Sequence, residues 1–176
     1  MAYASWSVVF GEQPSAAKWN ILGTNDSTFN TLLGTYGVRN PYCFRAYASG
    51  ATTLADGAST DIAFATEDYD YNNNFASSTY TAPVAGVYHF DACFTYATAI
   101  SSGVIANCRI IKGGALALTG TSSVPVTNGA YSVSGDLLLA QGDTIKAAGY
   151  HDSAGAEDVA TGSTQTWFSG HLVHAV

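Results

Sequence analysis

The stretch that decides the fold is Val87-Tyr-His-Phe-Asp-Ala-Cys-Phe-Thr-Tyr96. Its aromatic and β-branched residues are typical of a β-strand. Successive side chains of a strand point to opposite faces, so the two sets of alternate positions are expected to differ in burial. One set holds Tyr88, Phe90, Phe94 and Tyr96, and the other holds His89, Asp91, Cys93 and Thr95. The run therefore predicts a strand with one aromatic, core-facing side.

Shorter runs of the same kind lie on both sides of this stretch and are separated by turn signals. They are Cys43–Ala48, Thr60–Phe64, Thr79–Ala82, Asn107–Lys112, Ala115–Thr119, Tyr131–Leu139, Thr144–Tyr150 and Thr164–Val173. Gly113-Gly114 separates two of them and predicts a hairpin. Nothing after Val38 shows sustained helical periodicity. About eight to ten strands at this spacing predict an all-β sandwich or jelly roll.

The front of the chain lacks the succession of short alternating runs seen later. We expect residues 1–38 to form an arm and linker, and residues 39–176 to form the β domain. Pro14–Gly23 predicts a short helix, because proline is suited to its first turn and glycine to its end. Such a short helix is marginal alone. The apolar side chains of the arm must then pack on their own domain or insert into a partner. The candidates for anchoring are Trp6, Phe10, Trp19 and Leu22.

Composition excludes several classes of protein. The 176 residues suffice for one domain, and the net charge of −7 leaves no basic cluster to bind the phosphates of nucleic acid. No apolar run approaches the roughly 20 residues that a spanning helix needs, so we expect no membrane insertion. The first residues lack the basic and apolar regions of a secretory signal. Cys43, Cys93 and Cys108 are read as buried thiols of a protein made in a reducing cytoplasm, although a single Cys93–Cys108 bridge across neighbouring strands stays open.

Four pieces of the chain, in order, resemble the globular head of complement component 1q, a relative of tumour necrosis factor. They are Phe44–Ala48, Tyr69–Phe75 leading into Thr81–Phe90, Arg109–Gly114, and Leu137–Asp143 together with Thr166–Leu172. The resemblance covers residues 42 to 174, although no collagen-like Gly-x-y stem precedes the head. It implies a ten-strand jelly roll that assembles as a parallel homotrimer and binds partners through loops and side faces, without catalysis.

The front segment has a resemblance of its own. Val9–Asp26, followed by Phe29-Asn30, is similar to the opening of tail-fibre and minor structural proteins of bacteriophages. This resemblance implies a protein of the virion, assembled in the host cytoplasm. Residues 1–38 would then dock onto other virion proteins.

Two groups of side chains in the β region are candidate binding sites. Glu67, Asp68 and Asp70 precede three asparagines, and calcium takes carboxylate and carbonyl oxygens as ligands. The alternative is a solvated loop whose asparagines form Asx turns. No other cofactor is expected. Tyr69, Tyr71 and Tyr80 are candidate ligand-binding residues, because tyrosine among small polar residues is typical of adaptable binding surfaces and can stack on a sugar. The alternative is that they are ordinary tyrosines of a β-rich protein.

Catalytic constellations are missing from the sequence. There is no Gly-x-Ser-x-Gly elbow, and the four histidines, His89, His151, His171 and His174, accompany no nucleophile motif. We therefore expect a non-enzymatic trimeric virion protein (a fibre tip, spike or decoration) whose head binds a glycan or protein of the host surface. The alternatives are a bacterial surface or secreted ligand-binding module of the same fold and, less favoured, a carbohydrate-active enzyme, for which no pair of carboxylates is evident.

Overall fold

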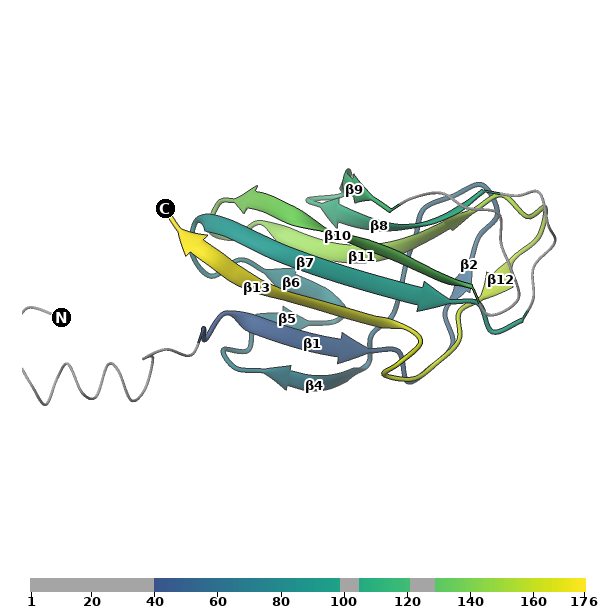
Figure 1. The fold of residues 1–176 in the computed structure, drawn as a ribbon, viewed down its shortest axis with the longest axis horizontal. Helices are drawn as coiled ribbons and strands as arrows, with labels where there is room; N and C mark the ends of the chain where they lie inside the picture. The colour runs from purple at the N-terminus through teal and green to yellow at the C-terminus, as the bar shows by residue number, and fades with distance from the viewer. Residues whose placement is uncertain (1–39, 99–104, 121–128) are drawn as a thin grey trace, which may run out of the picture. The chain divides into compact units, whose positions relative to one another are not determined.

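The computed structural model describes residues 40–98, 105–120 and 129–176 (Figure 1). The expected helix over Pro14–Gly23 and the anchoring candidates Trp6, Phe10, Trp19 and Leu22 lie outside these residues. Within the described ranges, no helix has the length and apolar character needed to cross a membrane.

In the described part of the chain, the first sheet has five antiparallel strands in the order β10-β7-β13-β1-β4. Figure 1 shows β7 between β10 and β13. The strands are β1 (Cys43–Tyr47), β4 (Thr66–Asp70), β7 (Gly86–Thr95), β10 (Ala130–Leu139) and β13 (Trp167–Ala175). The central strand β7 covers the run from which the fold was predicted, starting and ending one residue earlier.

The second sheet has the order β5-β6-β11-β8-β9, and β3 pairs with β11 outside this path. Its strands are β3 (Thr60–Asp61), β5 (Phe75–Ala76), β6 (Thr79–Thr81), β8 (Ala106–Lys112), β9 (Ala115–Thr119) and β11 (Thr144–His151). Two further strands, β2 (Thr53–Leu54) and β12 (Glu157–Asp158), pair with each other. The prediction of an all-β sandwich is confirmed.

The hairpin predicted around Gly113-Gly114 is also present. β8 and β9 pair antiparallel across these two residues. Gly113 and Gly114 have φ of 56° and 86°. Two positive φ angles in a two-residue turn suit the right-handed twist of the flanking strands, and glycine adopts them without a steric penalty.

The core between the two sheets is rich in aromatic rings. Phe44 stacks on Phe75 at 4.7 Å and on Tyr80 at 4.8 Å between ring centroids, and its edge contacts Phe168 at 4.9 Å. All four side chains are buried. Offset and edge-to-face pairs of this kind stabilise a core beyond the area that they bury. Tyr88, Phe90, Phe94 and Tyr96 are also buried, as predicted, but Cys93 and Thr95 of the other set are buried as well, so the two sides differ in burial only in the first half of β7.

One interpretation and one open alternative from the sequence are wrong in the structure. Glu67, Asp68 and Asp70 do not form a loop, because they belong to the edge strand β4. Cys93 and Cys108 are not on neighbouring strands, because β7 and β8 belong to different sheets. All three cysteines are free thiols, and burial raises the pKa of the Cys108 thiol.

Candidate functional site

The outer face of the five-stranded sheet carries a pattern of side chains that run in rows across its strands. The register places Asp136, His89, His171 and Cys43 opposite one another on β10, β7, β13 and β1. The next row holds Ser134, Asp91, Ser169 and Arg45. These positions alternate with the core positions of the same strands, so both rows face away from the core. We call this surface the outer sheet face.

His89 is the centre of the polar network on the outer sheet face. Its Nδ1 lies 2.6 Å from Oδ1 of Asp136, and its Nε2 lies 3.2 Å from Oδ2 of Asp91 and 3.1 Å from Oγ of Ser134. The ring of His171 lies 5.5 Å away between centroids. The hydrogen bond with Asp136 raises the pKa of His89, desolvation opposes that shift, and Asp91 adds to it. The imidazolium form is therefore favoured between these two carboxylates.

Apolar side chains flank this network on the outer sheet face. Leu138 on β10 and Val173 on β13 are 64% and 55% exposed. At the other end of the face, Trp167 is half-buried beneath Arg45, whose guanidinium carbon lies 5.6 Å from the ring centroid. Exposed apolar groups gathered on one face are typical of an interaction surface.

Tyr69 and Tyr71 lie at the edge of the same sheet. Their rings stack at 5.5 Å between centroids with an interplanar angle of 19°, and Tyr71 is 65% exposed. Burial of the Tyr69 hydroxyl raises its pKa. The two side chains thus form a small aromatic surface beside β4, in a position that can contact a ligand.

Tyr80, the third tyrosine of this predicted group, is not part of that surface. It is fully buried in the core, where burial raises the pKa of its hydroxyl. The expectation that it binds a ligand is wrong, because alternation in the short strand β6 points Tyr80 inward and leaves Thr79 and Thr81 on the other side.

The three carboxylates proposed for calcium do not converge. The register pairs Glu67 with Ala46 and Asp70 with Phe44, both core-facing residues of β1, while Asp68 lies in a bulge and forms an ion pair with the outward Arg45. Oδ2 of Asp70 accepts a hydrogen bond from the Phe75 amide at 2.8 Å. Among the described residues, no three His, Cys, Asp or Glu side chains are arranged to hold a metal ion. The prediction of a calcium site at Glu67, Asp68 and Asp70 is therefore wrong, because these carboxylates do not share one site.

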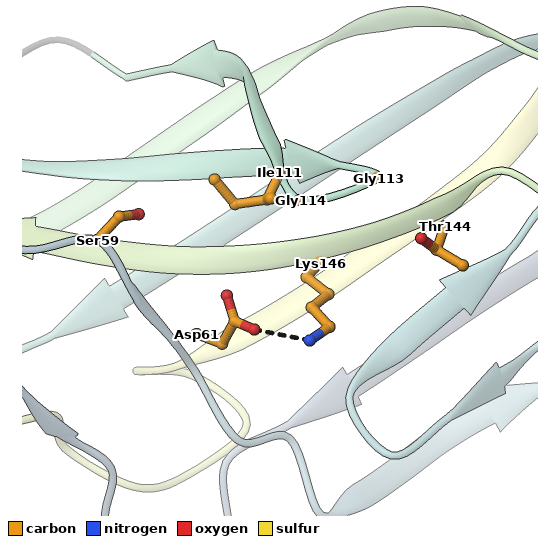
Figure 2. A pocket seen from close by; sticks show the side chains of 7 residues that line it. All are labelled: Ser59, Asp61, Ile111, Gly113, Gly114, Thr144 and Lys146. Carbon is orange, nitrogen blue, oxygen red and sulfur yellow. Dashed lines mark hydrogen bonds and ion pairs between the residues drawn. The ribbon is translucent and has the colours of Figure 1, made fainter.

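A separate pocket lies on the outer side of the second sheet (Figure 2). It has a volume of about 270 Å³ and is lined by Ser59, Asp61, Ile111, Gly113, Gly114, Thr144 and Lys146. Nζ of Lys146 donates to Oδ2 of Asp61 at 2.7 Å. No motif in the sequence predicts this pocket, because its walls come from separate segments: β3 and the residues before it, β8, β11 and the β8–β9 turn. The only signal of it in the sequence was Gly113-Gly114, which also predicts the hairpin.

Comparison with known proteins yields structural relatives only. No protein-family model matches the sequence, and no curated protein matches it. The globular domain of zebrafish complement 1qA protein is 15% identical with a TM-score of 0.56, over 77% of this chain and 99% of that chain. Eiger TNF from S. frugiperda is 13% identical with a TM-score of 0.57, over 78% and 96%. Murine APRIL is 11% identical with a TM-score of 0.56, over 75% and 98%. The chain therefore has the two-sheet jelly-roll fold of the complement 1q and tumour necrosis factor-like proteins.

Proposed function

We propose that the chain is a non-enzymatic, homotrimeric binding protein of a bacteriophage virion, such as a fibre tip, spike or decoration. Residues 1–38 dock onto other virion proteins, and residues 39–176 form a head that binds the host surface. The observation that supports a trimer is the exposure of two apolar side chains on the outer sheet face. Leu138 on β10 and Val173 on β13 are exposed on the two strands that flank β7. Proteins of this fold commonly form homotrimers. A closed symmetric assembly would cover the part of this face on β10, β7 and β13 in every copy and leave Tyr69 and Tyr71, at the β4 edge, open to a ligand.

The virion assignment is supported by the resemblance of Val9–Asp26 to the opening of phage tail-fibre and minor structural proteins. A particle that displays many copies of a head gains avidity from many weak contacts, so no single strong site is needed. Mass spectrometry of purified virions tests this assignment. We expect the chain among the virion proteins. Its recovery from the host envelope or the medium, and not from virions, would instead favour a bacterial ligand-binding module of the same fold.

Light scattering after size exclusion tests the trimer. The chain has a mass of 18.3 kDa, and we expect three times this mass both for the full chain and for a chain that lacks residues 1–38. A monomeric mass for both would contradict the trimer. A trimer that is lost on truncation would contradict the division between an anchoring arm and a self-assembling head.

Host-surface binding is supported by the stacked pair Tyr69 and Tyr71, because an exposed aromatic ring offers its face to a sugar. We expect the full chain to bind envelope polysaccharides of its host on an array. Tyr71→Ala should weaken that binding, and Ile105→Ala, which removes another exposed apolar group, 51% exposed just before β8, should not. Arrays that remain blank across several host envelopes would contradict glycan binding.

A further inference from the structure

The pocket on the outer side of the second sheet suggests which ligand the head takes. We propose that this pocket binds one ring of a neutral saccharide. The inference rests on the proposed host-surface binding and adds a second contact point, on a different sheet from Tyr69 and Tyr71. The volume of about 270 Å³ is just under the roughly 300 to 1,000 Å³ typical of small-molecule sites, which suits one ring of a longer chain.

The charges of the pocket favour a ligand without net charge. Asp61 and Lys146 are its two charged side chains, and their ion pair leaves the lining balanced. A phosphate or a carboxylated sugar could accept one of the remaining ammonium protons of Lys146, but the Asp61 carboxylate beside it would repel the ligand. The chain as a whole carries a net charge of −7, which also disfavours an anion.

The hydrogen-bonding groups of the pocket suit hydroxyls. A hydroxyl both donates and accepts, whereas a carboxylate only accepts and an ammonium only donates. The Asp61 carboxylate and the Lys146 ammonium stand side by side, and their one hydrogen bond uses one of two carboxylate oxygens and one of three ammonium protons. Adjacent hydroxyls of a sugar ring can therefore donate to Asp61 and accept from Lys146. Ser59 and Thr144 add hydroxyls at the walls (Figure 2).

The remaining walls suit the apolar side of a sugar ring and its close approach. Ile111 supplies an apolar contact for the C–H groups. Gly113 and Gly114 carry no side chain, and a Cβ on either would meet nothing within 4 Å. The ring can therefore lie directly against the backbone of the turn. This turn is held to the start of the neighbouring strand β11, because the amide of Gly113 donates to the carbonyl of Thr144 at 2.9 Å.

The test uses the full chain labelled with ¹⁵N and titrated with the methyl glycosides of glucose, mannose and galactose. We expect at least one of them to shift the amide signals of Gly113, Gly114 and Lys146 with saturation. N-acetylneuraminic acid, a carboxylated sugar, should shift them much less. The affinity of a single ring is expected to be weak, because few atoms make contact.

Two variants and a matched control test whether Lys146 and Asp61 bind the saccharide. Lys146→Met keeps the aliphatic stem and removes the donor, and Asp61→Ala removes the acceptor. Each should weaken binding at least tenfold. Lys112→Met is the control, since Lys112 forms a comparable ion pair with Asp143 at 2.9 Å and does not line the pocket. Spectra that agree with the wild type away from the substituted residue show that each variant has folded.

The outcomes separate this inference from the proposed function. No saturating shift with any of the three glycosides, or equal binding by Lys146→Met, Asp61→Ala and the wild type, overturns the pocket. Polysaccharide binding on the array would then rest on Tyr69 and Tyr71 alone, and the proposed function would stand. Shifts at the pocket with blank arrays would support the pocket and contradict host-surface binding.

Discussion

At the scale of single residues, His89 shows how neighbours from other strands decide the chemistry of a side chain. Asp91 lies two positions away on β7, while Asp136 and Ser134 come from β10 and His171 from β13. Together these groups place the ring between two carboxylates, beside a hydroxyl and a second imidazole. The sequence showed only that His89 belongs to the polar side of its strand.

The raised pKa of His89 leads to a prediction about pH. Because the folded state binds this proton more tightly than the unfolded chain, the stabilisation is complete below the unfolded pKa of about 6.5 and is lost as the pH rises through the higher folded pKa. An NMR titration of the His89 ring should therefore have its midpoint above about 6.5. Asp136→Asn should lower this midpoint, because Asp136 is the largest cause of the shift.

The matched variant for this titration is Asp143→Asn. Asp143 forms its ion pair with Lys112 and does not contact His89 in the network described above. We expect it to leave the midpoint of His89 unchanged. A wild-type midpoint at or below that of an unperturbed histidine would contradict the interpretation.

Gly170 is a second residue whose role depends on its surroundings. A Cβ at this position would lie 2.5 Å from Cδ1 of Phe90 and 2.9 Å from Cε1 of Phe44, both rings of the packed core. Gly170→Ala should lower the free energy of unfolding by about 1–3 kcal/mol, the usual cost of overpacking a core. Gly50→Ala is the control, because a Cβ there would meet nothing within 4 Å, and it should change stability by less than about 0.5 kcal/mol. Urea unfolding measures both, and equal values would contradict this account.

At the scale of elements, the edge strand β4 is bound to β1 by backbone pairing and by one side chain of β1, Arg45. Arg45 on β1 forms an ion pair with Asp68 of β4, donates to the carbonyl of Ser163 at 2.6 Å and lies over Trp167 of β13. Among the described residues, β4 pairs with β1 on one side only, at the end of the sheet. Arg45 therefore links the bulged edge strand to the loop before β13 and to β13 itself.

Removing this link should loosen β4 locally. We expect Arg45→Met to lower the free energy of unfolding by about 1–3 kcal/mol, mostly from the charged hydrogen bond to the carbonyl, because an exposed ion pair adds little. Amide hydrogen exchange in β4 should become faster. In Lys112→Met, which also removes an ion pair and a hydrogen bond to a carbonyl, exchange in β4 should stay as in the wild type. Unchanged exchange in Arg45→Met would show that Arg45 does not hold the strand.

At the scale of the whole molecule, the proposed trimer predicts a difference between two exposed leucines. Leu138 is 64% exposed on the outer sheet face, and Leu116 is 55% exposed on β9 of the other sheet. Leu138→Asp should dissociate the trimer into monomers, because burying an unpaired carboxylate in an interface is costly. Leu116→Asp should keep the trimeric mass. Light scattering after size exclusion distinguishes the two variants. A trimeric mass for Leu138→Asp would show that Leu138 does not lie in the trimer interface.

Local periodicity was enough to predict the class of the fold. The aromatic face of Val87–Tyr96, the hairpin at Gly113-Gly114 and the succession of short alternating runs all follow from side-chain alternation and turn chemistry. Both are properties of a few consecutive residues. The all-β sandwich was therefore readable from the sequence, and the structure confirms it.

Only the tertiary structure decided which side chains meet. Strand pairing brings Asp68 to Arg45, which lies 23 residues away in the chain, and Asp136 to His89, which lies 47 residues away. The burial of Tyr80 does not follow from its local sequence, because a strand of three residues is too short to show which of its sides is buried. The row of His89 and His171 and the pocket of Asp61 and Lys146 arise from the register between strands. Alternation and turn type constrain the register within a hairpin, but which strands far apart in the chain become neighbours is decided by how the two sheets pack.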